Sequence, residues 1–261
     1  QLLASLPSAR RRIGALNLER CLPEWSAADR RRLLRQHFVA MAQMLLEYGY
    51  CWFASPERLR RLMRIEGLEH LRALDGRAVV LMMPHFTGLD LAGLRISMET
   101  PVVSIYSRQK NAWLDEFFRT RRLRLGTGII FSRQQGTRAV IRALRDGYRL
   151  YYLPDQDFGR RDSVFVPFFG VDAATITGLS RMAAVADAAV LPCYPRRERD
   201  GYTLVIEPAL ADFPSADAAA DTARMNAVIE GQARRQLHQY FWLHKRFKSR
   251  PAGEPDFYAR G

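Results

Sequence analysis

A histidine followed by an aspartate five residues later could supply a proton acceptor and the acid that orients it. The pattern occurs as His70–Asp75 and again as His85–Asp90. A neutral imidazole accepts a hydroxyl proton near neutral pH, and a carboxylate at its other nitrogen fixes the tautomer. Because the two matches lie in different surroundings, we expect them to differ in function.

His70 and Asp75 lie in a stretch whose leucine spacing, over residues 68–74, is typical of a helix. Five residues of helix turn through ~500°, which leaves the two side chains ~140° apart. We therefore expect no contact between them and no catalytic role for either.

His85 instead follows Pro84 and the apolar run 78–83, where a buried strand should end and a loop begin. Gly88 lets that loop turn, so we expect the Asp90 carboxylate to fold back onto the imidazole. This predicts His85 as the general base and Asp90 as its orienting acid. The alternative for His85 is a structural histidine that hydrogen-bonds to backbone at a strand end.

Two further groups of polar residues could carry chemistry. Four arginines fall within residues 119–124, and Asp155 and Asp157 directly follow the apolar run 150–153. The arginines suit phosphate binding, although by themselves they are better explained as a solvated helix face. The two aspartates could ligate a metal, but no third ligand accompanies them.

The apolar runs and the stretches between them predict how these residues are positioned. Further runs that resemble buried strands cover residues 102–106, 190–194 and 202–206, and they alternate with helical stretches at 113–125, 137–145, 178–187 and 218–238. This alternation predicts an α/β fold with a mostly parallel central sheet covered by helices. Residues 1–75 read as a helical N-terminal part, including a long amphipathic helix that starts at Ser26, and residues 76–261 as the catalytic core of one domain. In such sheets the site lies beyond the carboxyl ends of the strands.

Composition limits the classes of partner. Forty Lys and Arg residues against 27 Asp and Glu give a net charge of +13, which favours an acidic protein, a membrane surface or nucleic acid. The three cysteines are too few and too scattered for a disulfide framework or a cysteine zinc site. Phosphate-loop, dinucleotide-binding, serine-hydrolase and zincin motifs are absent from the sequence, and so is any apolar run long enough to span a bilayer.

Several blocks in order resemble the late acyltransferases of lipid A biosynthesis. They are His85–Asp90, Tyr151–Phe169, Asn17–Glu24 near the start and Tyr240–Pro251 near the end. The resemblance implies transfer of an acyl group from an acyl-carrier-protein thioester to a hydroxyl of a phosphorylated glycolipid acceptor, giving an acyloxyacyl ester. It implies no cofactor and no metal. It also implies a place on the cytoplasmic face of the bacterial inner membrane, with an N-terminal anchor ahead of Gln1.

The resemblance also assigns two residues. The functional arginine of the family, which follows a Tyr…Asn…Asp stretch, falls on Arg122, counted from Tyr106, Asn111 and Asp115. Its functional acid after the later strand falls on Asp155. We expect Arg122 to bind an acceptor phosphate or the oxyanion, and Asp155 to hold Arg122 or to position the acceptor.

Two other functions remain open at this point. The same chemistry could act on another lipid, such as a lysophospholipid, an inositol mannoside or an amino-acid lipid. A basic nucleic-acid-binding module is a distant alternative, because it needs exposed aromatic residues among the arginines, and here most aromatics fall in apolar runs. The apolar segment 164–169 could form core or an acyl-chain groove.

Overall fold

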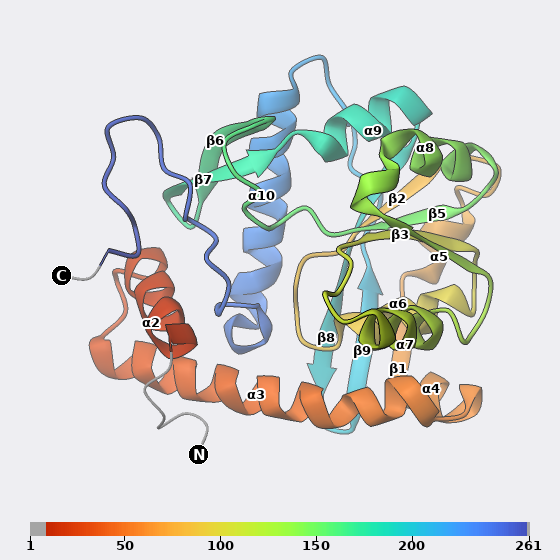
Figure 1. Ribbon diagram of the computed structural model, residues 1–261, viewed down its shortest axis with the longest axis horizontal. Coiled ribbons are helices and arrows are strands. Elements are labelled where there is room, and N and C mark those ends of the chain that lie inside the picture. Colours follow the sequence, from red (N-terminus) through yellow and green to blue (C-terminus); the bar gives the residue numbers. More distant parts are fainter. Residues whose placement is uncertain (1–8, 260–261) are drawn as a thin grey trace.

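The computed structural model describes residues 9–259, and its centre is a seven-stranded sheet with helices on both faces (Figure 1). The strand order is β1-β9-β8-β2-β5-β3-β4, and a separate hairpin is formed by β6 and β7. The strands are β1 (Met63–Glu66), β2 (Val79–Met82), β3 (Val102–Tyr106), β4 (Gly128–Ser132), β5 (Arg149–Tyr152), β6 (Ser163–Phe168), β7 (Val171–Ile176), β8 (Ala189–Glu198) and β9 (Gly201–Ile206).

Five neighbouring strands, from β8 through β2, β5 and β3 to β4, run parallel. The strand β9 is antiparallel to β8, and β1 pairs with β9 in parallel. The predicted α/β fold with a mostly parallel sheet is therefore confirmed. Sequence analysis did not predict β1, β4 or the β6–β7 hairpin. The four residues of β1, which lie inside the stretch read as helical, are too few to show a strand period.

The helices follow the expected stretches closely, with an additional helix directly after the His85 loop. They are α2 (Ala9–Cys21), α3 (Ala27–Phe53), α4 (Pro56–Leu62), α5 (Leu68–Arg72), α6 (Leu89–Ser97), α7 (Ala112–Arg122), α8 (Thr137–Arg145), α9 (Gly178–Ala186) and α10 (Ala218–Arg235). The long helix α3 begins where expected, because the Ser26 side chain accepts a hydrogen bond from the backbone N–H of Asp29.

The sheet separates two apolar cores, as the central strand β2 illustrates. Val79 and Leu81 pack into the core beneath α4, α5 and α6, whereas Val80 and Met82 pack into the core beneath α8, α9 and α10. A strand buried on both faces must be apolar at every position, which explains the continuous apolar run in the sequence. The long helix α3 crosses the edge of both layers (Figure 1).

Within residues 9–259, no helix is both long enough and apolar enough to cross a bilayer.

Candidate active site

His85 and Asp155 meet because the strands before them are neighbours in register. Met82 ends β2, Tyr152 ends β5, and these two residues pair directly in the sheet. His85 and Asp155 each follow three residues later. The backbone N–H of Met83 still donates to the Tyr152 carbonyl, at 2.8 Å, so the two chains leave the sheet side by side.

The Asp155 carboxylate holds His85 at two points. The imidazole Nδ1 lies 2.6 Å from Asp155 Oδ1, and the backbone N–H of His85 donates to Asp155 Oδ2 at 2.9 Å. A carboxylate only accepts, so Nδ1 carries the proton and Nε2 is left as the basic nitrogen. The Gln156 side-chain amide donates to that Nε2 at 2.9 Å. The histidine is therefore held in the tautomer that a general base requires. Its ring forms hydrogen bonds to side chains, and not to backbone as expected for a purely structural histidine.

Asp155 is almost fully buried, with 2% of its surface exposed. Burial by itself would raise its pKa, but the charge on His85 and the two hydrogen bonds from His85 outweigh that effect and lower the pKa below the ordinary aspartate value. Asp155 therefore stays ionised throughout the neutral range, where it can stabilise an imidazolium at His85.

The C-terminal segment fixes the backbone of the His85 loop. Phe86 bridges to Tyr240 in antiparallel fashion, the Phe241 N–H donates to the His85 carbonyl at 2.9 Å, and the Thr87 N–H donates to the Gln239 carbonyl at 2.9 Å. Two blocks far apart in the sequence are thereby joined. A short strand-like pairing with the tail, and not only the end of β2, sets the position of His85.

The predicted contact between Asp90 and His85 is wrong, because Asp90 has other partners. Helix α6 begins at Leu89, directly after Gly88, which has a φ of +82°. A side chain at Gly88 would also meet the Tyr202 ring at 2.8 Å. Being already in the first turn of that helix, Asp90 faces α3 and α7, where Oδ1 accepts from Arg122 Nε at 2.8 Å and Oδ2 from the Tyr48 hydroxyl at 2.7 Å.

The two acids have therefore exchanged the partners that we expected for them. Asp155 holds the histidine, and Asp90 holds Arg122. The Asp90 charge raises the pKa of Arg122 and fixes the guanidinium at the rim of the site. The pKa of Tyr48 is also raised, first by burial and then by Asp90, so its hydroxyl stays protonated as a donor.

The residues that lead up to Arg122 position α7. The Asn111 side chain caps this helix by accepting from the backbone N–H groups of Trp113 and Leu114, at 2.9 and 3.1 Å. Asp115 accepts from the Tyr106 hydroxyl at 3.0 Å, which ties the first turn of α7 to the end of β3. The Tyr…Asn…Asp spacing thus has a structural reason: it sets the helix that presents Arg122.

The neighbouring arginines have other partners. Arg119 pairs with Glu116, the Arg121 guanidinium lies over the Phe53 and Phe117 rings, and Arg124 donates to three carbonyls at the end of α3. The reading of the cluster as a plain solvated helix face is therefore wrong for Arg121, Arg122 and Arg124.

The second histidine–aspartate match takes separate partners, as predicted. His70 Nδ1 lies 2.8 Å from the Ile206 carbonyl, and Asp75 pairs with Arg149 at 3.2 Å. The reason differs from the one expected, because α5 ends at Arg72 and leaves Asp75 in the following turn.

Asp157, considered above as a metal ligand, accepts hydrogen bonds from the Ser249 backbone and hydroxyl, at 2.7 and 3.0 Å, and from the Gly159 N–H. It therefore anchors the C-terminal tail, while Asp155 faces His85. Within residues 9–259, no group of three or more His, Cys, Asp or Glu residues is placed to hold a metal ion.

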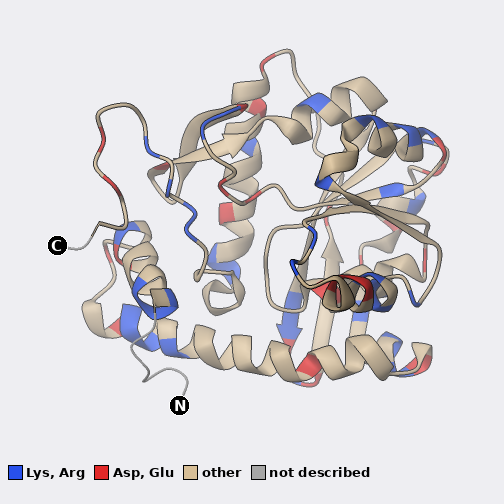
Figure 2. Ribbon diagram, viewed as in Figure 1, with Lys and Arg blue, Asp and Glu red and all other residues tan. Residues whose placement is uncertain are grey.

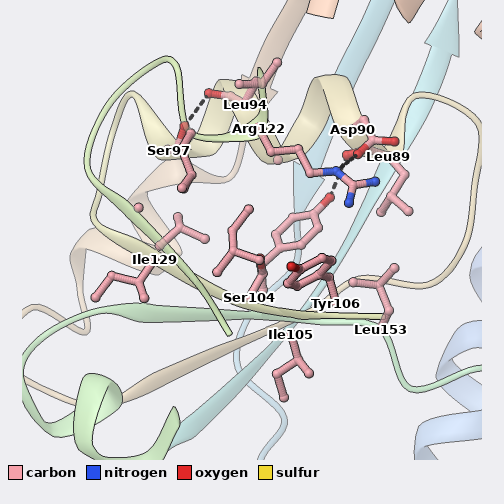
Figure 3. A pocket seen from close by; sticks show the side chains of 16 residues that line it. Leu89, Asp90, Leu94, Ser97, Ser104, Ile105, Tyr106, Arg122, Ile129 and Leu153 are labelled. Atoms are coloured by element: carbon pink, nitrogen blue, oxygen red, sulfur yellow. Dashed lines mark hydrogen bonds and ion pairs between the residues drawn. The ribbon is translucent and has the colours of Figure 1, made fainter. Parts of the chain in front are cut away.

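His85 and Arg122 line one groove with a volume of about 490 Å³. Beyond Arg122 an apolar cavity of about 130 Å³ opens between α6, β3 and β4, as Figure 3 shows. The groove and the cavity share Ile105, Tyr106 and Leu153 on their walls. Arg122 also lines both, so the cavity lies directly beside the groove.

Comparisons with known proteins give the same family over nearly the whole chain. Residues 1–249 match the family described as bacterial lipid A biosynthesis acyltransferase. The chain is similar to the lipid A biosynthesis lauroyltransferase of Escherichia coli, at 36% identity over 93% of this chain and 80% of that protein. It is similar also to the palmitoleoyltransferase of the same pathway and organism, at 35% over 95% and 82%, and to the myristoyltransferase, at 31% over 98% and 80%.

The chain belongs to this family. It is an acyltransferase, and the predicted resemblance is confirmed. Of the two possibilities for the apolar segment 164–169, core or acyl-chain groove, this acyltransferase shows core, because Val166, Phe168 and Phe169 are buried.

Sequence reasoning missed two residues of the candidate site. Gln156 adjoins Asp155 in the sequence, so its presence beside His85 follows once Asp155 is placed there. Tyr48 was predicted only as part of the apolar face of the long helix, and nothing in the spacing of that face indicates that its hydroxyl contacts Asp90.

Proposed function

We propose that the protein transfers a fatty acyl group from an acyl-carrier-protein thioester to a hydroxyl of a phosphorylated lipid A precursor. The acceptor hydroxyl belongs to a 3-hydroxyacyl chain, so the product is an acyloxyacyl ester. Family membership supports the reaction class. The observation that carries the mechanism is the 2.6 Å contact between His85 Nδ1 and Asp155 at the wall of a groove that also contains Arg122.

In this mechanism Nε2 of His85 takes the proton of the acceptor hydroxyl as the oxygen attacks the thioester carbonyl. The new C–O bond forms, the C–S bond breaks, and the departing thiolate receives the proton back from the imidazolium. Asp155 orients the ring and stabilises its transient positive charge, the role that a buried acid has in a hydrolase triad. No acyl-enzyme forms, because the thiolate is a good leaving group.

Gln156 has to release Nε2 before the base can act. Its amide occupies the nitrogen that must meet the acceptor hydroxyl. When the hydroxyl takes that position, the amide is free to donate to the carbonyl oxygen, on which negative charge develops. A donor already beside the reacting atoms suits oxyanion stabilisation.

Arg122 supplies positive charge on the same wall, held by Asp90. A guanidinium fits a phosphate of the acceptor and also fits the oxyanion. The two roles separate kinetically: loss of a phosphate contact raises KM for the acceptor, whereas loss of oxyanion stabilisation lowers kcat.

The donor and the acceptor are both acidic, which fits the net charge of +13. We place the reaction on the cytoplasmic face of the bacterial inner membrane. Raising salt to about 0.5 M should increase KM for the acyl-carrier donor, because screening shortens the range of exposed charges. A salt-independent KM, or equal use of acyl-coenzyme A, would contradict the carrier protein as the natural donor.

Mass spectrometry of the acceptor tests the reaction. The purified protein, one acyl-carrier donor and one tetraacylated precursor should give a product heavier by one acyl group. His85→Ala should abolish this product, whereas His70→Ala and Asp75→Asn, the matched pair, should leave it nearly unchanged. Acylation of a lysophospholipid, an inositol mannoside or an amino-acid lipid in preference to the lipid A precursor would replace the acceptor. Robust turnover by His85→Ala would refute the mechanism.

A further inference from the structure

Most of the large apolar side chains that residues 9–259 expose lie in only two helices. Leu46 and Phe53 on α3 are 80% and 69% exposed, and Trp113 on α7 is 69% exposed. Val39 and Leu45 on α3 and Leu114 on α7 complete the set. Positions 39, 46 and 53 recur at intervals of seven and therefore lie along one side of α3. Monomeric soluble proteins rarely gather such residues without a partner for them.

The two helices form one surface, because aromatic and cationic contacts join them. Trp52 packs edge-on against Phe117 at 5.1 Å, and the Arg121 guanidinium lies 5.2 Å from the Phe53 ring and 5.3 Å from the Phe117 ring. The exposed Trp113 stacks on Phe117 at 5.5 Å. We call the surface formed by Leu45, Leu46, Phe53, Trp113 and Leu114 the α3–α7 face.

The charges along α3 are arranged as in a helix that lies in a membrane interface, and both acids of α7 have partners, Asp115 in Tyr106 and Gln109, and Glu116 in Arg119. Glu47 is the only Asp, Glu, Lys or Arg between Arg35 and Glu57, and its carboxylate is occupied by Arg197 and the Tyr202 hydroxyl. Exposed arginines lie at both ends of this stretch, at positions 31, 32 and 35 before it and at positions 58, 60 and 61 after it (Figure 2). Apolar side chains bordered by basic ones favour an anionic bilayer surface.

The face also adjoins the site. Tyr48, on the inner side of α3, donates to Asp90. A narrow crevice between α3 and α7 is lined by Tyr48, Trp52 and Phe118, and its wall also includes the Arg122–Asp90 pair. A lipid whose chains lie in the bilayer beneath this face would have its head group close to Arg122.

We propose that the α3–α7 face rests in the head-group region of an anionic phospholipid bilayer, so that the acceptor enters the groove from the membrane side. The entry of the acceptor from the membrane side rests on the proposed function, whereas the membrane-binding surface follows from exposure and charge alone.

The test uses the whole chain and vesicles of phosphatidylglycerol and phosphatidylethanolamine without any lipid A precursor. Leu46→Glu and Phe53→Glu should each weaken partitioning roughly tenfold or more, since each replaces an apolar contact with the bilayer by a charge that anionic lipid repels. Val185→Glu is the matched control, because Val185 is 55% exposed on α9, away from the face. Brominated lipid should quench the emission of Trp113, and Trp113→Phe should remove that quenching. Equal binding of Leu46→Glu and Val185→Glu would overturn the proposal.

Two further outcomes distinguish membrane binding from dimer formation and from the proposed function. If the wild type forms dimers that Leu46→Glu abolishes, and does not bind vesicles, the face binds a second copy of the chain and the membrane proposal is wrong. With acceptor dispersed in detergent, Leu46→Glu should turn over like the wild type, and with acceptor in vesicles it should fall roughly tenfold. Vesicle binding through the face without any acyl transfer would support this proposal and refute the proposed function.

Discussion

Replacing Arg119, Arg122 and Arg124 by alanine, one at a time, removes the same charge from the same segment but three different sets of contacts. Arg119 makes an exposed pair with Glu116, at 2.7 and 2.9 Å. Arg122 pairs with Asp90 at the groove wall. Arg124 donates to the carbonyls of residues 50, 51 and 54, at 3.2, 2.6 and 2.7 Å, and so caps the C-terminus of α3. The three variants should therefore differ both in stability and in activity.

The magnitudes follow from exposure and from the number of contacts. Loss of the exposed Arg119 pair should leave the unfolding free energy nearly unchanged. The Arg122 side chain is 41% exposed, so solvent screening keeps its stability effect within about 1 kcal/mol. Arg124 makes three charge-assisted hydrogen bonds at a helix end, and its loss should cost about 3 kcal/mol, or roughly 6–12 °C in Tm. If Arg122 acts in the site, its removal should lower kcat/KM by roughly 10²–10³.

Calorimetry and steady-state kinetics at a temperature where all three variants are folded would separate the effects. We expect Arg122→Ala to lose activity with little change in Tm, Arg124→Ala to lose Tm with little change in turnover, and Arg119→Ala to change neither. Equal loss of kcat/KM in all three variants would mean that the segment acts as diffuse charge, and the specific role of Arg122 would be wrong.

Two other predictions concern a buried histidine and the apolar cavity. Burial lowers the pKa of His37 from 6.5 to about 4, so between these pH values the unfolded chain binds a proton that the folded protein does not bind. The unfolding free energy should therefore fall as pH falls from 6.5 toward 4. This group contributes up to about 1.4 kcal/mol per pH unit. Denaturant unfolding at pH 5 to 7 should show a shallower pH dependence in His37→Gln, and an unchanged slope would contradict this assignment. A Cβ at Gly93 would lie 3.7 Å from the Tyr151 ring, an ordinary contact on the cavity wall, so Gly93→Met should fit and shorten the cavity. If it excludes two methylenes, kcat/KM for the longest accepted donor should fall roughly tenfold relative to shorter ones, and an unchanged chain-length profile would place the acyl chain elsewhere.

Much of the fold was predictable because strands buried on both faces are mostly apolar. Val102–Tyr106 and Thr137–Arg145 have the predicted bounds, and β2, β5 and β8 overlap their predicted runs. The strand β1 was missed because Met63–Glu66 is too short to show a period. The strand β4 was missed because Gly128–Ser132 is also short and begins with a glycine.

The site was only half predictable, because its contacts depend on the order of strands in space. Sequence reasoning placed His85 and Asp155 at the same rim of the sheet, but it could not show that β2 and β5 are neighbours with Met82 opposite Tyr152. Without that adjacency, the nearest acid in the sequence, Asp90, was taken as the partner of His85. The start of α6 at Leu89 turns Asp90 toward Arg122 instead.

The central claim is that Asp155, and not Asp90, holds the imidazole of His85. Proton–nitrogen NMR of protein labelled with ¹⁵N-histidine tests it directly, because an Nδ1 proton hydrogen-bonded to a carboxylate resonates far downfield. The His85 signal, assigned by its absence in His85→Ala, should disappear or move far upfield in Asp155→Asn and persist in Asp90→Asn. A signal that survives in Asp155→Asn and is lost in Asp90→Asn would contradict the account.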